Sequence, residues 1–168
     1  MIDPTERAAN AATERDVDQL ELLVRDDDAR VRAIALAALV RVAPAPTAAT
    51  TWVAAAHDAD PRVRRRAAEV APKLGRSART RTLSELLADD DAWVAEAAAY
   101  AIGEHPRPTA TAIDALRAAA TSHTDALVRE AAVAALGAIG DPSTLPAVLA
   151  ACDDKPAIRR RAVLALAA

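Results

Sequence analysis

The segment at residues 123–136 reads HTDALVREAAVAAL, and four other stretches of the chain share its pattern. Each stretch has one or more acidic residues, then a valine or isoleucine that we call the anchor, usually an arginine, and an alanine-rich run. The other copies are DDDARVRAIALAAL at 26–39, DADPRVRRRAAEVA at 58–71, DDDAWVAEAAAYAI at 89–102 and DDKPAIRRRAVLAL at 153–166. Copies spaced by about 30 residues are typical of repeat proteins whose units stack on one another.

Each copy predicts a helix, because its apolar residues recur at helical spacing. The anchors are Val31, Val63, Val94, Val128 and Ile158. The fourth residue after each anchor is always alanine, and the eighth is Leu39, Ala71, Ile102, Leu136 or Leu166. Residues at offsets 0, 4, 7, 8 and 11 from the anchor lie on one face of a helix, because each residue advances the helix by 100°. The alanine lies at the centre of that face, where a larger side chain would hold neighbouring helices apart.

A second, shorter helix is expected before each copy. The candidates are Val17–Arg25, Ala48–His57, Ala78–Ala88, Ala110–Ala120 and Thr144–Cys152. Asp16 with Gln19, Ser77, and Asp141 with Pro142 are expected to start three of these helices. A further helix, Pro4–Thr13, is expected to cap the first repeat. Pro72 predicts a kink or stop near Ala71 in the second copy.

The predicted fold is all-α: a right-handed α–α superhelix of about five two-helix repeats with an N-terminal capping helix. We interpret residues 1–168 as a single domain. The repeats cover approximately 16–43, 47–75, 77–105, 109–140 and 141–168. Pairs of prolines and glycine-containing turns separate them.

These residues resemble the HEAT-like repeats of the phycobilisome-lyase type. The most similar stretch is VREAAVAALGAIGDP at 128–142, continued by Leu145 and Pro146. The resemblance covers the chain from about Asp16 and implies a solenoid fold. It leaves function open, because members of such families include scaffolds, lyase subunits and enzymes. Ala95 departs from the pattern, since arginine is expected there.

Composition excludes several classes of protein. Hydrophobic residues make up 52% of the chain, which argues against disorder, and the net charge of −3 indicates neither a general nucleic-acid binder nor an extremely acidic protein. The single cysteine, Cys152, excludes an internal disulfide. We find no apolar run near 18 residues and no signal-peptide pattern in Met1–Arg15, so we expect a cytoplasmic protein.

The sequence gives little support for catalysis, a cofactor or a metal. His57, His105 and His123 lie in different loops, and two repeats separate the first from the last. One HEAT-like enzyme family, the deoxyhypusine hydroxylases, binds iron through His-Glu pairs, but no His-Glu dipeptide occurs here. Cys152 has no histidine near it and is expected to be a small core residue. We therefore expect no enzyme activity, no cofactor and no bound metal.

An arginine follows the anchor in four copies, at Arg32, Arg64, Arg129 and Arg159. These residues could form an anion-binding row. Alternatively, each could bridge to loop aspartates such as Asp28, Asp60 or Asp125 in the same or the next repeat. Recurrence at one repeat position favours the structural interpretation, because every repeat needs the same connection.

A basic region lies at Arg62–Arg81, and it gives the first alternative function, nucleic-acid binding. Its basic residues are Arg62, Arg64, Arg65, Arg66, Lys73, Arg76, Arg79 and Arg81, against the single acid Glu69. The balance reverses in residues 82–126, and this acidic stretch would repel a long duplex. The second alternative is a lyase or enzyme subunit that acts with another chain.

The main functional prediction is a non-catalytic protein-binding module, such as an adaptor, scaffold or assembly factor. Offsets 2, 6, 9 and 13 from the anchor point away from the packed face and are expected to line the concave side. The candidate partner-binding residues are Arg65, Glu69, Glu96, Tyr100, Glu130 and Arg160, together with Trp93. Tyr100 could be an interface anchor or could lie flat along the surface.

The two tryptophans are expected to differ. Trp52 aligns with Leu20 and Leu83 in the first-helix pattern, so it is expected in the core. Trp93 precedes an anchor, where it could pack under a loop or stand exposed as a contact residue. The partner is expected to be another protein or peptide, and weak self-association through the apolar C-terminal helix is also expected.

Overall fold

The computed structural model describes residues 4–167, in which helices follow one another in pairs and no strand occurs. The second helices of the repeats are α3 (Ala29–Val42), α5 (Pro61–Leu74), α7 (Ala92–Gly103), α9 (Ala126–Ile139) and α11 (Pro156–Leu166). The helix α1 (Pro4–Glu14) comes before the first pair, and the first helices of the repeats are α2 (Val17–Leu23), α4 (Ala45–Ala55), α6 (Thr80–Leu87), α8 (Ala110–Ser122) and α10 (Leu145–Ala150). Short 3₁₀ turns occur at Gly75–Ser77, Pro142–Thr144 and Ala151–Asp153. The predicted all-α class is confirmed.

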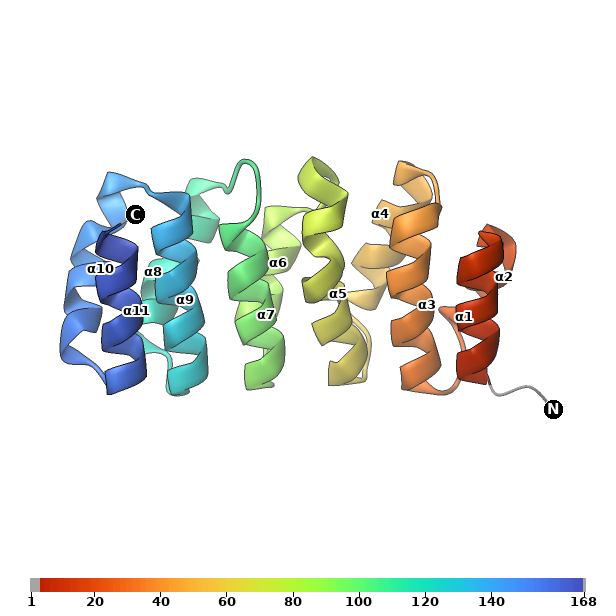
Figure 1. Cartoon of the computed structure of the whole chain (residues 1–168), viewed down its shortest axis with the longest axis horizontal. Coiled ribbons are helices and arrows are strands. Elements are labelled where there is room, and N and C mark those ends of the chain that lie inside the picture. Colours follow the sequence, from red (N-terminus) through yellow and green to blue (C-terminus); the bar gives the residue numbers. More distant parts are fainter. Residues whose placement is uncertain (1–3, 168) are drawn as a thin grey trace. The chain divides into compact units, whose positions relative to one another are not determined.

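The chain divides into two compact units, which we call unit 1 (Met1–Ala78) and unit 2 (Arg79–Ala168). In unit 1, α3 packs between α1 and α5, while α2 and α4 lie against this row (Figure 1). In unit 2, α9 packs between α7 and α11, while α6, α8 and α10 form the second row. The interpretation of the chain as one domain stays a prediction.

Aspartates start most of the second helices. Asp28, Asp60, Asp91 and Asp125 each stand at an N-cap in extended conformation and accept a hydrogen bond from the backbone N–H two residues on. This bond satisfies one of the donors that a helix start leaves open. The last second helix, α11, begins after Lys155 without a side-chain cap.

The core contains the two sets of residues that the repeat pattern predicts, the anchors and the alanines four residues after them. All five anchors are at most 1% exposed, and all five alanines at the fourth position, Ala35, Ala67, Ala98, Ala132 and Ala162, are 0% exposed. Because these methyl groups are fully enclosed, the second helices can pack closely only if the row stays small. Trp52 is buried as expected, and its Nε1 donates to the carbonyl of Ala67 at 2.7 Å.

Two predicted helix boundaries are wrong. The helix containing Pro72 does not stop near Ala71 but continues to Leu74, because a proline in the last turn removes only one backbone hydrogen bond. The alternative, a kink near Ala71, stays a prediction. Gly75 then ends it with φ of 53°. Ser77 starts no helix: it closes a 3₁₀ turn, and α6 begins after Arg79.

Glycines allow close helix packing in unit 2. A Cβ on Gly103 would lie 2.8 Å from the Cα of Ala135, and one on Gly137 would lie 2.6 Å from the Cβ of Ala165. Both glycines stand nine residues after an anchor, at an offset predicted to point away from the core. That part of the prediction is wrong, since offset 9 faces the next second helix.

No helix within residues 4–167 combines the length and the apolar character needed to cross a bilayer.

Candidate functional site

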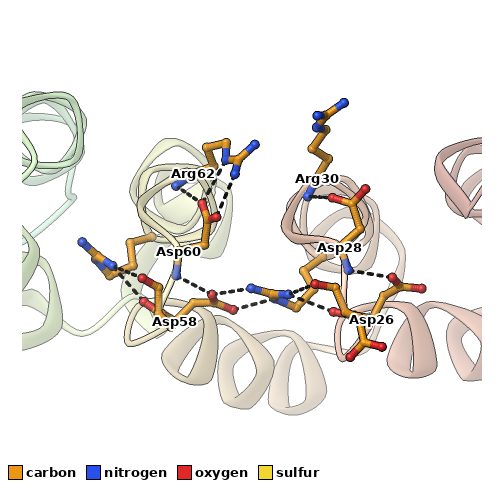
Figure 2. A network of polar contacts seen from close by, with 10 residues as sticks. Asp26, Asp28, Arg30, Asp58, Asp60 and Arg62 are labelled. Carbon is orange, nitrogen blue, oxygen red and sulfur yellow. Dashed lines mark hydrogen bonds and ion pairs between the residues drawn. The ribbon is translucent and has the colours of Figure 1, made fainter.

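Arg32 connects two repeats of unit 1. Its Nε donates to Asp58 Oδ2 at 2.8 Å and its Nη2 to Asp58 Oδ1 at 2.7 Å. Its Nη1 donates to the carbonyls of Asp26 and Asp27 in its own loop at 2.9 and 3.0 Å. Asp58 also accepts from the backbone N–H of Asp60, as Figure 2 shows. The guanidinium therefore ties its own loop to the loop of the next repeat.

Arg129 repeats this geometry in unit 2. Its Nε donates to Asp154 Oδ2 at 2.7 Å and its Nη2 to Oδ1 at 3.0 Å. Its Nη1 donates to the carbonyls of His123 and Thr124 at 2.8 and 3.1 Å. The structural interpretation of this arginine position is confirmed at Arg32 and Arg129.

The predicted acceptors of these ion pairs are wrong. Asp28, Asp60 and Asp125 use their oxygens to cap helices, whereas Asp58 and Asp154 receive the arginines. Asp58 and Asp154 lie two residues and one residue ahead of the N-cap of the next second helix, and there each carboxylate meets the arginine of the preceding repeat. The sequence does contain a signal for these acceptors, because most copies carry an aspartate a few residues ahead of the anchor.

Hydrogen bonds set the pKa values of these carboxyl groups. Burial alone would raise the pKa of Asp58, but hydrogen bonds from the Arg32 side chain and the Asp60 backbone bring it below its ordinary value. The hydrogen bond from Arg129, with that from the backbone of Lys155, lowers the pKa of Asp154 to about 2. Both carboxylates are therefore charged at neutral pH.

The connection between α7 and α9 is different. Ala95 stands at the arginine position and is fully buried. The loop ahead of the next anchor carries His123 where the corresponding loop has Asp58. His123 Nδ1 accepts from the backbone N–H of Asp125 at 3.1 Å, as Asp58 accepts from Asp60. At this connection, Ala95 and His123 thus stand in place of the arginine and its aspartate acceptor. The hydrogen bond within the loop, from the backbone N–H two residues on, is still present.

An aromatic face occurs on α7 in unit 2. Trp93 is 53% exposed and Tyr100 is 38% exposed, and seven residues separate them. That spacing is two helical turns, so both side chains lie on one side of the helix, with Glu96 between them. The N-cap Asp91 accepts from the backbone N–H of Trp93 at 2.9 Å. Of the two possibilities for Trp93, the structure shows the exposed one.

The other predicted partner-binding residues of unit 2 lie on the next two helices. Glu130 on α9 is half-buried and forms an ion pair with Arg161 of α11 at 3.6 Å. Arg160, also on α11, is exposed. The Glu130 carboxylate therefore already connects α9 to α11. Trp93 and Tyr100 are the large exposed side chains among the candidate residues of unit 2.

Arg65 and Glu69 belong to α5 of unit 1. Arg65 Nε lies 2.9 Å from Glu69 Oε1, and Arg66 Nη1 lies 2.7 Å from Glu69 Oε2. Arg62 pairs with Asp60 at 3.0 Å, and in unit 2 Arg81 pairs with Glu85 at 3.1 Å. Much of the basic region is therefore matched by nearby acids within each unit.

The residues considered for catalysis or metal binding do not meet. Among the described side chains, no three His, Cys, Asp or Glu residues are close enough to hold one metal ion. His105 Nδ1 accepts from the backbone N–H of Arg107 at 3.1 Å. Cys152 is half-buried, and its thiol lies 3.8 Å from the carbonyl of Val148. The absence of a metal stays a prediction, which elemental analysis of the purified protein would test.

Stacked helix pairs with a buried alanine row and arginine–aspartate connections define an α-solenoid repeat protein. The family model described as HEAT repeats matches residues 18–103 and 80–167. These segments span most of the chain, so the protein belongs to the HEAT-repeat family. The predicted family resemblance is confirmed. No curated protein sequence gives a significant match.

Solved structures share the fold. The complex of CpcE and CpcF of phycocyanin lyase from Nostoc sp. PCC7120 is 27% identical, with a TM-score of 0.71 over 89% of this chain and 63% of that one. This chain thus spans less than two thirds of that relative. Human deoxyhypusine hydroxylase in complex with glycerol is 22% identical, with a TM-score of 0.61 over 98% of this chain and 68% of that one. A designed armadillo repeat protein in complex with the peptide (KR)4 is 18% identical, with a TM-score of 0.67 over 97% and 85%.

Proposed function

We propose that this chain is a non-catalytic protein-interaction module, and that the aromatic face of α7 binds its partner protein. The observation that carries the proposal is the exposure of Trp93 and Tyr100 on one side of one helix. The chain has only three aromatic residues, and the third, Trp52, is fully buried.

Interface energetics support this choice of residues. Tryptophan and tyrosine are enriched among the residues that carry most of the binding energy in protein interfaces. Two turns of helix place Trp93 and Tyr100 about 10 Å apart along the axis, a span that a short partner segment can cover.

The remaining candidate residues extend the proposal within their own units. Glu130 and Arg160 would form the polar surroundings of the aromatic face in unit 2. Arg65 and Glu69 belong to unit 1 and would act there. We expect all four to contribute less than the aromatic residues, since charged groups that are exposed or already ion-paired add little to affinity.

The test begins with affinity purification of the protein from its native host and identification of a co-purifying protein by mass spectrometry. The dissociation constant of that partner is then measured for the wild type and for Tyr100→Ala. We expect the binding free energy to weaken by more than about 1 kcal/mol, or roughly fivefold in affinity, because the truncated side chain no longer contacts the partner. Trp93→Ala is expected to act in the same direction.

The control is Arg117→Ala on α8, where Arg117 pairs with Asp114 at 2.8 Å on the helix itself. It should leave binding almost unchanged. Equal losses from Arg117→Ala and Tyr100→Ala, or no loss from Tyr100→Ala in a variant that melts like the wild type, would place the binding site elsewhere.

A lyase or enzyme subunit is the second candidate. Its support is the likeness to the structure of phycocyanin lyase, in which CpcE and CpcF form a complex. A co-purifying chain that gives activity only together with this protein would favour this candidate over the first.

A further inference from the structure

Unit 1 has a groove between α3 and α5 that the proposed function does not use. Its volume is about 380 Å³, within the range of known ligand sites. The lining consists of four arginines, one glutamate and two apolar residues: Arg30, Arg62, Arg65, Arg66, Glu69, Ala33 and Ile34. Both helices contribute, so the groove exists only when the two repeats are stacked.

Equivalent positions create this concentration of positive charge. Arg30 and Arg62 each precede an anchor, and Arg65 and Arg66 follow the second anchor by two and three residues. Residues before the anchor and two or three after it share one side of a helix, so adjacent helices present their arginines to the same groove.

The arginines differ in how they are held. Glu69 pairs with both Arg65 and Arg66, and Asp60 pairs with Arg62. Arg30 is exposed, and among the described residues its guanidinium has no ion-pair or hydrogen-bond partner. Figure 2 shows its side chain extending away from the aspartates that surround the helix start. One cation of the groove is therefore available to a ligand without breaking an existing pair.

We propose that this groove binds an acidic peptide segment of a partner protein. A carboxylate already fits here, since Glu69 occupies the space between two guanidinium groups. A second carboxylate, from a partner, would be held by Arg30 together with Arg62, because guanidinium groups bind carboxylates through parallel hydrogen bonds. Ala33 and Ile34 would receive an apolar side chain of the same peptide.

Nucleic acid fits the groove less well. A phosphate backbone carries a charge at every nucleotide and needs an extended row of cations. Here Asp28 and Asp60 cap the starts of the two helices that form the groove, and their negative charge interrupts any such row. A peptide can place its carboxylates only where the arginines are.

The inference rests on the proposed function in one respect, since it assumes a protein as the partner. The probe is a fluorescein-labelled peptide rich in glutamate with one leucine, titrated with the full chain by fluorescence anisotropy. We expect saturable binding that weakens as salt is added. Arg30→Ala should raise the dissociation constant about fivefold, and the double variant Arg30→Ala with Arg62→Ala should raise it further.

The matched control is Arg41→Ala, which removes an exposed arginine from the other end of α3 with the same change in net charge. It should alter the constant by less than about twofold, as expected for an exposed charge outside the groove. Thermal melts establish that each variant is folded. Equal effects of Arg30→Ala and Arg41→Ala would overturn the proposal, as would the absence of peptide binding at low salt.

A labelled single-stranded oligonucleotide is titrated in parallel. Tighter binding of the oligonucleotide than of the peptide, lost in Arg30→Ala, would also overturn the proposal and favour nucleic acid. Tyr100→Ala should leave peptide binding unchanged. If the acidic peptide does not bind while a captured partner still depends on Tyr100, the groove proposal fails alone; if neither holds, the proposed function fails with it.

Discussion

Arg129 and Asp154 are joined by two parallel hydrogen bonds, of 2.7 and 3.0 Å, that connect α9 to the loop before α11. Both side chains are largely shielded from solvent, and the third guanidinium nitrogen binds loop carbonyls. Arg159 stands at the same repeat position one copy later, where it is exposed and its side chain has no partner among the described residues. The same residue type therefore has a structural role in one repeat and none in the next.

Removing the Arg129 guanidinium should destabilise the fold by about 1 kcal/mol, since charge-assisted hydrogen bonds are lost but solvent screens part of their energy. Urea unfolding of Arg129→Ala measures this change. Arg159→Ala is the matched control, with the same substitution at the same repeat position, and should change stability little. Equal unfolding midpoints for the two variants would contradict the assigned role.

The same ion pair predicts a pH dependence. The pKa of Asp154 is lowered to about 2 in the folded protein, against about 3.9 in an unfolded chain. A depressed folded pKa contributes stability that is complete above the unfolded value and is lost as pH falls toward the folded value. The stability difference between wild type and Asp154→Asn should therefore be constant from neutral pH down to about 5, and shrink between about 4 and 2. Urea titrations at a series of pH values would show this, and a difference that grows on acidification would refute it.

The row of buried alanines should not tolerate larger side chains. Ala98→Leu or Ala132→Leu should destabilise by roughly 1–3 kcal/mol, because the added atoms force neighbouring helices apart. Thermal melts provide the measurement. Ala138→Leu, an exposed position on α9, makes the same change without the steric conflict. Unchanged midpoints in both core variants would mean that the row is not a steric requirement.

Gly137→Ala should destabilise unit 2 although alanine is the better helix former. The new Cβ would lie 2.6 Å from the Cβ of Ala165, and overpacking should outweigh the gain of about 1 kcal/mol in helix propensity. Adding Ala165→Gly to the variant moves the methyl group to the other helix and should recover part of the loss. A more stable single variant would show that α9 and α11 can separate freely.

The apolar surface of α11 should cause weak self-association. Val163 and Leu164 are 57% and 63% exposed, whereas the residues equivalent to Val163 in the other copies, Leu36, Ala68, Ala99 and Val133, are buried. Apolar surface of this kind is normally covered. Sedimentation should show a mass that rises with concentration and returns to the monomer in Leu164→Glu. A clean monomer for the wild type at high concentration would count against it.

The sequence predicted most of the fold because helical periodicity depends on side-chain spacing, which the chain shows directly. The anchors and the alanine row recur in five copies, so errors in one copy are corrected by the others. Helix ends were less predictable. Ser77 lies in a turn that Gly75 determines, and Pro72 sits where only one hydrogen bond is lost.

The candidate sites were predictable only in part. Offset from the anchor shows that Tyr100 points away from the core, and the structure agrees with its exposure. Whether it binds a partner is not encoded in spacing. The choice of Asp58 over Asp60 as acceptor depends on loop conformation, and the arginine groove depends on which residues of α3 and α5 meet. Neither follows from the pattern within one helix.

Ala95 and His123 also constrain how this sequence can change. Introducing arginine at position 95 alone would place a guanidinium beside a loop that carries His123 where the corresponding loop carries Asp58. A partly buried guanidinium without a carboxylate partner is destabilising, so the stability effect of arginine at position 95 should depend on whether position 123 is histidine or aspartate. The two positions therefore form an epistatic pair, and the α7–α9 connection can take the charged type found elsewhere without a loss of stability only if position 123 changes first or at the same time.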